Sequence, residues 1–294
     1  MEVGGDKRKE NNLQNVNRIQ KVIGFIGAGN MAKAIGEGLI KSGAVDASQI
    51  YISAPTQRNI GTWMELGAHT SDNNGFVVKN ADVIILAMKP QYLDAALAET
   101  SDSLGDWLPN TKLFISVLGG IRIDTLEEKL KKIVIRPRVI RAMPNTPMMV
   151  QEGCSAFCRS ISATDEDVKI THQIFSAGGR CEMIPESLMN AVSAVSGSGP
   201  AFIFVMMEAL ADGAVKMGIP RASSIELVAQ TVLGSAKMVL ESGQHPGQLK
   251  DSVCSPGGSS ICGINVLERA GVRGVLMDAI EATVKRSEEM GKLS

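Results

Sequence analysis

The sequence predicts an α/β protein, in which a doubly wound parallel sheet is followed by a second domain made only of helices. Three observations predict it: a glycine turn directly after a β-branched run, strand and helix patterns that alternate to about residue 185, and helical patterns alone beyond that point. We therefore expect a disordered tail over residues 1–20, a dinucleotide-binding domain over 21–185 and an all-helical domain over 186–294.

The first twenty residues are polar and charged, without an apolar period, which is typical of a disordered tail. Glu2, Asp6 and Glu10 lie among the basic residues of this tail, whereas mitochondrial presequences avoid acids. The N-terminus lacks the apolar core of a secretory signal, and we find no apolar run of the roughly 18 residues that span a bilayer. We expect a cytoplasmic protein that does not enter a membrane.

The charge balance argues against a nucleic-acid partner. Thirty basic and 31 acidic residues leave a formal net charge of −1, so the chain has no global field that attracts a polyanion. Hydrophobic residues make up 44% of the 294 residues and aromatic residues only 4%, which predicts a large aliphatic core. A small molecule is the expected partner.

The cysteines and histidines favour neither disulfides nor a metal site. The five cysteines are odd in number and form no CxxC pair, so we expect reduced and mostly buried thiols. The three histidines are scattered, without a neighbouring ligand at metal-binding spacing, so we expect no metal. The cysteines are Cys154, Cys158, Cys181, Cys254 and Cys262.

The glycine turn has the dinucleotide-binding form GxGxxA. The apolar run Val22–Ile26 ends at Gly27, which allows a tight turn, and Gly29 lets the backbone approach a pyrophosphate. Small Ala32 permits close packing of the following helix on the strand. This pattern predicts a Rossmann-type domain that holds the pyrophosphate at a helix N-terminus.

Strand and helix patterns follow this turn in alternation. The expected strands are Val22–Ile26, Ile50–Ser53, Val83–Ala87, Leu113–Val117 and Val139–Met143. The expected helices are Met31–Lys41, Gln57–Leu66, Tyr92–Leu104 and Ile123–Lys132. Residues 151–184 continue the pattern weakly and are expected at the edge of the same sheet, with Thr164 capping a helix over Asp165–Ser176. Ligands of such sheets bind beyond the carboxyl ends of the strands.

The segment after the second run suggests the cofactor. It reads SAPTQRN from Ser53 to Asn59 and lacks the acid that usually holds the ribose hydroxyls of NAD. Its hydroxyl groups and Arg58 suit a 2′-phosphate, so we favour NADPH, with NADH as the second choice. A plain helix cap formed by Ser53 to Thr56 explains the same residues and is compatible with cofactor binding.

Three later loops also follow expected strands. Pro90 suits the first turn of a helix, and Lys89 before it is either a catalytic acid or a positioning charge. The pair Gly119 and Gly120 permits close backbone approach. Asn145 stands in a rigid turn between two prolines, where it is expected to face the nicotinamide.

Helical patterns alone fill the region beyond residue 186. They are Leu188–Ser196, Ala201–Met217, Ala222–Glu241 and Val272–Met290, and the two central ones are apolar on most faces. A domain of this size has too little interior to bury such helices, so we expect an obligate homodimer. A single well-packed bundle is the alternative.

A second glycine-rich segment, SPGGSS from Ser255 to Ser260, interrupts these helices. Its glycines expose consecutive N–H groups, its serines add donors and a helix follows, which together suit a carboxylate. An ordinary serine-capped turn has the same spacing.

The motifs GFIGAGNMA, AMKP, RAMPNTP, SGSGPAF, GQHPGQLKD and SPGGSSI occur in this order over nearly the whole chain after the tail. Together they resemble pyrroline-5-carboxylate reductase, and SAPTQRN with ESGQHPGQLKDSVCSPGG looks closest to the cytosolic type 3 branch. The resemblance implies reduction of 1-pyrroline-5-carboxylate to L-proline by NAD(P)H, the last step of proline synthesis. It also implies interlocked dimers, often five to a decamer, whose active site is shared between subunits.

The resemblance also implies residue roles. The cofactor-binding residues are Ile26, Gly27, Ala28, Gly29, Asn30, Met31, Ser53, Ala54, Thr56, Arg58, Asn74, Ala87, Met88, Lys89, Pro90, Val117, Leu118, Gly119 and Asn145, of which Ser53, Arg58 and Asn145 come from the loop patterns above. The substrate-binding residues are Glu186, Gly257, Gly258, Ser259 and Ser260. Ser260 is the expected catalytic residue; it orients the imine nitrogen and relays a solvent proton. The family usually has threonine at this position, and some members have glutamate where this chain has Gly243.

Two other functions remain as alternatives. β-Hydroxyacid dehydrogenases share the opening motif and a helical second domain, but they need a helical lysine, and the helix after Pro200 has none until Lys216. A non-catalytic NADPH-binding regulator would bind the cofactor without oxidising it.

Overall fold

A computed structural model describes residues 18–56 and 59–292. The expected tail lies for the most part outside this range, as does Arg58. The chain forms two compact units, Met1–Gly197 together with Val284–Ser294, and Ser198–Thr283. The expected division after residue 185 stays a prediction, and we describe each unit by itself.

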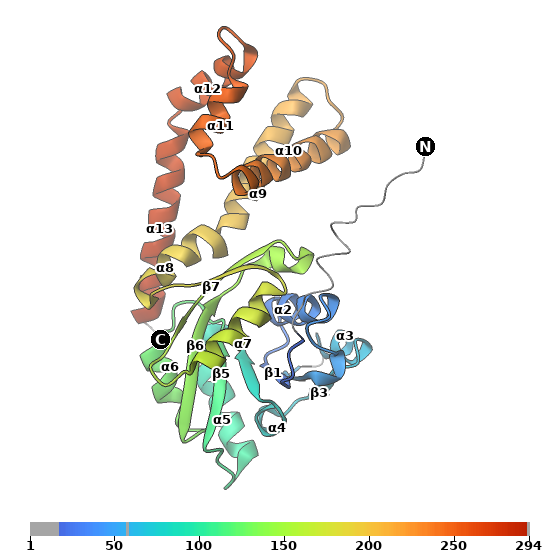
Figure 1. The fold of residues 1–294 in the computed structure, drawn as a ribbon, viewed down its shortest axis with the longest axis vertical. Helices are drawn as coiled ribbons and strands as arrows, with labels where there is room; N and C mark the ends of the chain where they lie inside the picture. Colours follow the sequence, from blue (N-terminus) through green and yellow to red (C-terminus); the bar gives the residue numbers. More distant parts are fainter. Residues whose placement is uncertain (1–17, 57–58, 293–294) are drawn as a thin grey trace. The chain divides into compact units, whose positions relative to one another are not determined.

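The first unit is built on one sheet of eight strands in the order β3-β2-β1-β4-β5-β6-β7-β8. Figure 1 shows the strands between flanking helices. Their bounds are β1 (Ile23–Ile26), β2 (Ile50–Ser53), β3 (His69–Ser71), β4 (Val83–Leu86), β5 (Thr111–Ser116), β6 (Arg136–Met143), β7 (Gly153–Arg159) and β8 (Gly179–Met183). This arrangement confirms the doubly wound α/β fold and places residues 153–183 at the edge of the same sheet.

One strand departs from the expected parallel arrangement, because β7 runs antiparallel to β6. Only the short 3₁₀ helix η5 (Thr146–Val150) lies between these two strands. A parallel return needs a crossover of a dozen or more residues, so this short connection can only turn the chain back. The last strand, β8, is again parallel to β7.

Two elements of the sheet domain were missed by the sequence patterns. The edge strand β3 has only three residues, all polar, and pairs with β2. The helix that follows, α4 (Asn74–Asn80), is seven residues long. Neither is long enough to show a hydrophobic period, so the sequence pattern does not predict them.

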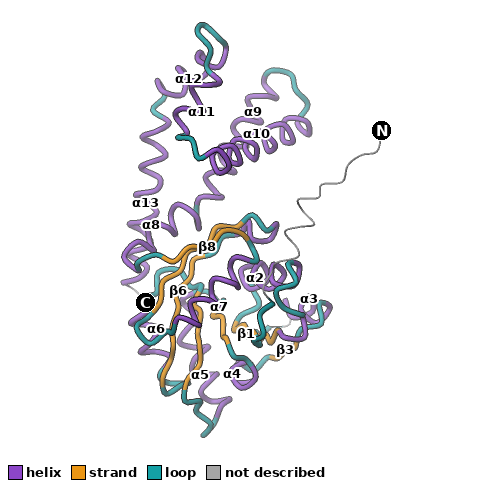
Figure 2. The backbone as a smooth tube through the Cα atoms, in the orientation of Figure 1, coloured by secondary structure: helices purple, strands orange, loops and turns teal. Residues whose placement is uncertain are grey.

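Helices cover both faces of the sheet, as Figure 2 shows. The apolar residues of α2 and α7 share one core cluster, and those of α4, α5 and α6 share the other. The helices of this unit are α2 (Asn30–Lys41), α3 (Ile60–Glu65), α4, α5 (Leu93–Leu104), α6 (Ile123–Leu130), α7 (Asp165–Ser176) and α8 (Met189–Val192). The remaining short turns are η2 (Ala47–Gln49), η4 (Pro90–Tyr92), η6 (Glu186–Leu188) and the π-helical η7 (Ser193–Gly197).

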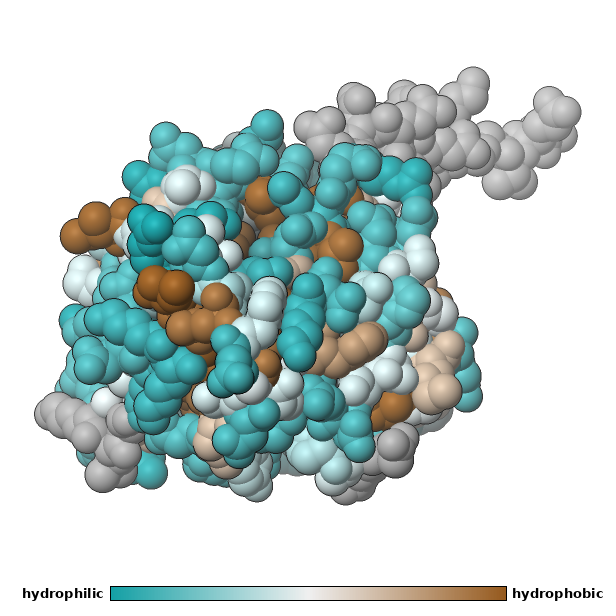
Figure 3. Space-filling model, turned by 90° about the horizontal axis from the view of Figure 1, so that it is seen from below, coloured by the Kyte–Doolittle hydropathy of each residue, from teal (hydrophilic) through white to brown (hydrophobic). Residues whose placement is uncertain are grey.

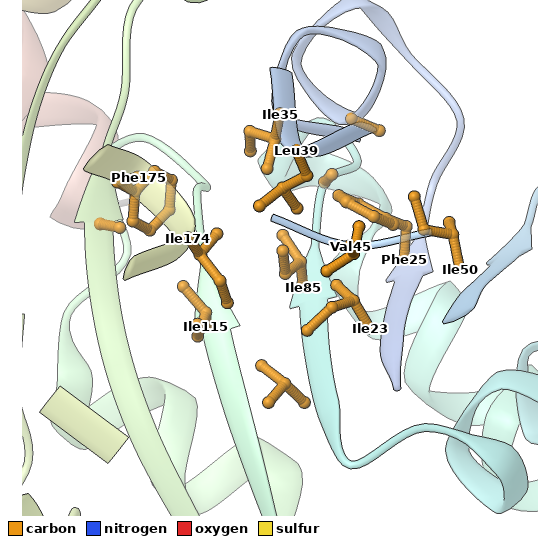
Figure 4. Packing of buried hydrophobic residues seen from close by; sticks show 14 of the residues in the cluster. Ile23, Phe25, Ile35, Leu39, Val45, Ile50, Ile85, Ile115, Ile174 and Phe175 are labelled. Atoms are coloured by element: carbon orange, nitrogen blue, oxygen red, sulfur yellow. The ribbon is translucent and has the colours of Figure 1, made fainter. Parts of the chain in front are cut away.

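The core follows from the period of two in the strands. In β1, Ile23 and Phe25 belong to one cluster and Ile26 belongs to the cluster on the opposite face. Figure 4 shows Ile35 of α2 and Ile174 of α7 packed on the first of these faces. Both faces of the strand are buried, which is why it reads as a continuous apolar run.

The second unit is helical throughout its described residues. Its elements are α9 (Gly199–Lys216), α10 (Arg221–Ser242), α11 (Pro246–Val253), α12 (Ser259–Arg269) and the first part of α13 (Val272–Lys292). Of the segment SPGGSS that is expected to interrupt the helices, Ser255 to Gly258 lie between α11 and α12, and Ser259 and Ser260 begin α12. In α9 only Ala211 is buried, and in α10 only Ser224 is buried. The apolar side chains of both helices are thus exposed in the single chain.

One sequence-based statement about membranes needs correction. The helical stretch Glu186–Lys216 is long and apolar enough, by length and composition, to cross a membrane, and 11% of its most apolar window is buried. We had found no apolar run of this length, because serine, glycine and asparagine interrupt the run without lowering its average hydropathy enough. Core helices of soluble proteins pass the same test, so the feature does not place the chain in a membrane. The face in Figure 3 is mainly hydrophilic, with separate hydrophobic patches.

The cysteines are more exposed than expected. All five are free thiols, but only Cys158 is buried, whereas Cys154 and Cys262 are exposed. Cys154 follows the first residue of β7 with its side chain outward, and Cys262 lies in α12, whose residues are not buried in one chain. The expectation of mostly buried thiols is therefore wrong for the single chain.

Candidate active site

The glycine turn after β1 adopts a conformation that only glycine tolerates. Gly27 has a φ of 105°, and a Cβ atom at this position would lie 2.7 Å from the carbonyl oxygen of Ala87. Its N–H donates to the carbonyl of Ser53 over 2.8 Å. The turn therefore fits between the ends of two neighbouring strands only without a side chain.

The N-terminus of α2 is open to a ligand. Gly29 is the N-cap and provides no side-chain hydrogen bond, so the first N–H groups of a 12-residue helix have no capping partner. Ala32 is fully buried, which lets the helix lie close to the sheet. Free N–H groups together with the helix dipole suit a pyrophosphate, so this cradle fits a dinucleotide cofactor.

The residues expected near the adenosine differ in accessibility. Ser53 is fully buried, and its hydroxyl group donates to Oδ1 of Asn74 over 2.7 Å. Ala54 is also buried, with its N–H bonded to Ser71, whereas Thr56 is exposed. The Ser53 side chain therefore holds Asn74 in place, which leaves Thr56 as the accessible hydroxyl of this loop.

A cavity of about 260 Å³ lies next to the glycine turn. It contains two carboxylates that sequence reasoning missed, Asp72 after β3 and Glu99 on α5. Asp72 directly follows β3, which is where ligand-binding residues of such a sheet are expected. This strand has only three residues, so the sequence pattern does not reveal it. Its lining residues are Ile26, Gly27, Pro55, Asp72, Asn74, Met88, Tyr92, Ala95, Ala96 and Glu99.

The loops expected at the nicotinamide follow the ends of β4 and β5. Main-chain hydrogen bonds continue beyond the strands, from the N–H of Ala87 to Ile26 and from that of Val117 to Leu86. Leu118 is buried in the core, so it offers only its backbone to a ligand. Lys89 is exposed and precedes η4, where proline occupies the first turn as expected.

The end of the last helix lies beside these loops, which the sequence did not indicate. A Cβ atom on Gly291 would lie 2.6 Å from the carbonyl oxygen of Gly120. Arg286 and Met290 of α13 line a cavity of about 490 Å³ together with Gly119. The C-terminal part of α13 thus belongs to the first unit and lies against the loop after β5.

Asn145 uses its side chain inside the protein. The amide nitrogen donates to the carbonyl of Ser196 over 3.1 Å, and the amide oxygen accepts from the N–H of Cys154 over 2.8 Å. The side chain is 7% exposed. These bonds tie the end of β6 to β7 and to η7, and the expected contact of Asn145 with the nicotinamide stays a prediction.

Glu186 is paired with a buried arginine. Its Oε1 accepts from the N–H of Ile123 over 2.8 Å and lies 3.3 Å from NH1 of Arg141, whose side chain is 3% exposed. NH2 of Arg141 donates to Asn190 over 3.2 Å. Burial, and next the charge of Glu186, raise the pKa of the nearby Cys158 thiol to about 12. The structure thus places Glu186 in an internal network of the first unit.

The serine loop belongs to the second unit. Gly257 has a φ of 70°, and Gly258 is the N-cap of α12 without a side-chain hydrogen bond. Ser259 and Ser260 are the first residues of this 11-residue helix, and both are exposed. The glycines, the exposed hydroxyls and the open helix start fit a bound carboxylate.

The two sets of expected residues are therefore distributed over two units. The described cofactor residues lie in the first unit. Most of them lie at the carboxyl ends of β1, β2, β4 and β5 or in the turns that follow, whereas Asn74 begins α4 after β3 and Asn145 follows β6. The glycines and serines of the substrate loop lie in the second, whereas Glu186 lies in the first. Over residues 18–56 and 59–292, no group of three His, Cys, Asp or Glu side chains is placed to hold a metal ion.

A glycine cradle at the switch point of a doubly wound sheet is typical of dinucleotide-binding proteins. Two family models match the chain: "NADP oxidoreductase coenzyme F420-dependent" over residues 22–120 and "Pyrroline-5-carboxylate reductase dimerisation" over residues 186–290. A protein named pyrroline-5-carboxylate reductase from Methanosarcina acetivorans is 45% identical over 92% of this chain and 98% of its own length. The chain belongs to the pyrroline-5-carboxylate reductase family.

Other relatives agree with this assignment. Pyrroline-5-carboxylate reductase 3 of Macaca fascicularis is 41% identical over 92% of this chain and 96% of its own length. A crystal structure of Plasmodium falciparum pyrroline carboxylate reductase with NADP bound has a TM-score of 0.82 and 32% identity; it covers 94% of this chain and 100% of its own. The resemblance inferred from the motifs is confirmed, and the β-hydroxyacid dehydrogenase and regulator alternatives are not favoured.

Proposed function

We propose that this chain reduces 1-pyrroline-5-carboxylate to L-proline with NAD(P)H, the last step of proline biosynthesis. The observation that carries the proposal is the similarity over 92% of the chain, which spans both the glycine turn after β1 and the serine loop before α12. The first of these elements suits a dinucleotide and the second suits a carboxylate. A reductase of a carboxylated imine needs both.

The proposed cofactor residues come from the motifs, and the open start of α2 in the first unit supports them. Residues Ile26 to Met31 would hold the pyrophosphate, with the free N–H groups at the start of α2 as donors. Ala54 and Thr56 would hold the adenosine-phosphate side, and Asn74 the adenine region. Ala87 to Pro90 and Val117 to Gly119 would hold the ribose and nicotinamide. We favour NADPH because no acid follows β2 within the described part of this loop.

NADPH, when bound, supplies the hydride for the imine carbon. The backbone loops after β4 and β5 orient the reacting face, and positioning contributes much of the rate enhancement in such a reaction. Gly257 to Ser260 bind the substrate carboxylate. The Ser260 hydroxyl orients the ring nitrogen and relays a proton from solvent, because a serine hydroxyl is too weak an acid to store one.

For Glu186 and Asn145 we propose positioning roles instead of direct ligand contacts. The Glu186 carboxylate already binds Arg141 and the start of α6, and the Asn145 amide joins β6 to η7. Both side chains therefore stabilise the segment that leaves the sheet domain.

A homodimer is the proposed assembly. The family model that matches residues 186–290 is named for dimerisation, and exposed apolar residues such as Phe204, Val205 and Leu210 lie along α9. A second copy that covers α9 and α10 would bury them. We also propose a decamer of five dimers, which the resemblance supports. The near-neutral net charge supports the absence of a nucleic-acid partner. The resemblance and the acidic residues of the tail support a cytoplasmic location without a membrane partner.

The experiment that tests the function follows the absorbance of NADPH with purified protein. Three reactions are compared: with pyrroline-5-carboxylate, with a β-hydroxyacid and NADP, and with NADPH alone. We expect NADPH oxidation only with pyrroline-5-carboxylate, accompanied by formation of proline. Turnover of the β-hydroxyacid, or cofactor binding without any turnover, would contradict the proposal in favour of the corresponding alternative.

A further inference from the structure

The cavity beside the glycine turn combines apolar and charged lining residues. Its walls are largely apolar, with contributions from Pro55, Met88 and Ala96. Two carboxylates, Asp72 and Glu99, line the cavity as well. Apolar walls suit the faces of a flat base, and carboxylates suit hydrogen-bond donors at the edge of such a base.

The amide of Asn74, which also lines this cavity, is already engaged. Its Oδ1 accepts from the Ser53 hydroxyl over 2.7 Å, and its Nδ2 donates to the carbonyl of Ala96 over 3.2 Å. Tyr92 also lines the cavity, with its side chain 56% exposed. The two carboxylates are the charged side chains of the lining, and they only accept hydrogen bonds when ionised.

Glu99 is held in place by its neighbours. Its Oε2 accepts from the N–H of Asn74 over 3.2 Å. Burial raises the pKa of the Glu99 carboxyl, and the charges of Asp72 and Asp102 add to this rise, whereas hydrogen bonds from Asn74 and Ser103 oppose it. A carboxylate that is partly removed from water gains stability from a further hydrogen-bond donor.

We propose that Glu99 selects the base of the cofactor by accepting a hydrogen bond from the exocyclic amino group of a 6-aminopurine. A 6-oxopurine presents a carbonyl oxygen at the same edge, so two acceptors would face each other and neither would be satisfied. The inference rests on the proposed function, because it takes this cavity as the base-binding part of the NADPH site. It adds a determinant of cofactor specificity outside the glycine turn and the loop after β2.

The test compares the dissociation constants of NADPH and its deamino analogue, in which hypoxanthine replaces adenine, using nicotinamide fluorescence. We expect the wild-type protein to bind the analogue at least tenfold more weakly, as for the loss of one hydrogen bond to a charged group. Glu99→Gln should reduce this ratio to about threefold or less, because an amide donates to the 6-oxo group. Asp102→Asn is the matched control: Asp102 is an exposed acid on the same helix that does not line the cavity, and the variant should keep the wild-type ratio.

Three results would overturn the inference: equal binding of both dinucleotides by wild type, an unchanged ratio in folded Glu99→Gln, or equal weakening of both ligands by that variant. The last result would show that Glu99 only supports Asn74. If Glu99→Gln does not fold, Glu99→Asp is the second variant. It withdraws the carboxylate by one methylene group, so it should lower the ratio of the two dissociation constants. Absence of any NADPH binding by wild type would instead contradict the proposed function, so the two failures are distinguishable.

Discussion

Ser260 lies at the start of α12 with an exposed hydroxyl, where it is available to a substrate. Ser260→Ala should lower kcat by about ten- to a thousandfold, in line with the loss of one positioned polar group. Steady-state kinetics with pyrroline-5-carboxylate and NADPH measures this effect.

Ser260→Thr is the matched control for this change, because threonine keeps the hydroxyl and has the methyl group that restricts its rotation. It should retain turnover close to that of wild type. Near-normal turnover of folded Ser260→Ala would remove Ser260 from the mechanism.

The network around Arg141 gives Glu186 a structural role that can be measured. Glu186→Gln leaves a side chain that is only 3% exposed without its paired carboxylate. Breaking a buried pair typically costs about 3–5 kcal/mol, and the 24% exposure of Glu186 lowers our expectation to about 2–3 kcal/mol. Urea unfolding monitored by circular dichroism provides the free energy of unfolding.

Glu289→Gln is the control for this measurement. The Arg286–Glu289 pair has side-chain exposures of 65% and 61%, so its loss should change the stability little. If Glu186 contacts the substrate instead, Glu186→Gln would raise the KM for pyrroline-5-carboxylate while leaving the stability unchanged.

Two thiols, the buried Cys158 and the half-buried Cys181, make the stability depend on alkaline pH. Burial raises the pKa of Cys158 from 9.0 to about 12, and burial has the same effect on Cys181. Between these values the unfolded thiols lose protons while the folded ones keep them, so the unfolded state binds fewer protons and the stability falls as pH rises. The urea midpoint should decrease from pH 9 upward, and less steeply in Cys158→Ala. If the urea midpoint fell equally steeply with pH in wild type and in Cys158→Ala, Cys158 would ionise freely in the folded state.

At the scale of elements, α7 shows how a local signal determines where a helix begins. Thr164 accepts from the N–H of Asp167, and the Asp167 carboxylate accepts from the N–H of Thr164. This reciprocal capping confirms the start that the sequence predicts. Thr164→Ala should lower the free energy of unfolding by about 1 kcal/mol, whereas Thr164→Ser should have little effect. Equal stabilities of the Ala and Ser variants in urea would contradict this role.

The predictability of an element depended on its length and burial. The apolar runs locate β1, β2 and β4 within one residue at each end. By contrast, β5 and β6 begin two and three residues before the expected starts Leu113 and Val139, because their first residues are mainly polar. The edge strand β3 lacks such a run because its three polar residues face water. The same holds for the candidate site. The sequence predicts the glycine turn, because it follows a long apolar run, but it does not indicate Asp72 after β3 or Glu99 on α5.

At the scale of the whole molecule, the exposed apolar side chains of α9 and α10 predict self-association. Light scattering after size-exclusion chromatography should give at least twice the 31.2 kDa of one chain. Phe204→Asp introduces a charge at a side chain that is 62% exposed in the single chain, and it should shift the protein toward monomer. Leu108→Asp, at an exposed leucine of the first unit, should leave the mass unchanged. A monomeric wild-type protein would contradict the assembly.

The sequence by itself determined the fold class, the cofactor turn and the family, because these depend on residues close together in the chain: a β-branched run, the glycines after it and the serine loop before a helix. Only the tertiary structure decided what the polar side chains do. Ser53 meets Asn74 across 21 positions, Arg141 meets Glu186 across 45, and Asn145 meets Ser196 across 51. Such partners come from different strands and helices, so no local pattern reveals whether a polar side chain is free to bind a ligand or is already used to hold the fold together.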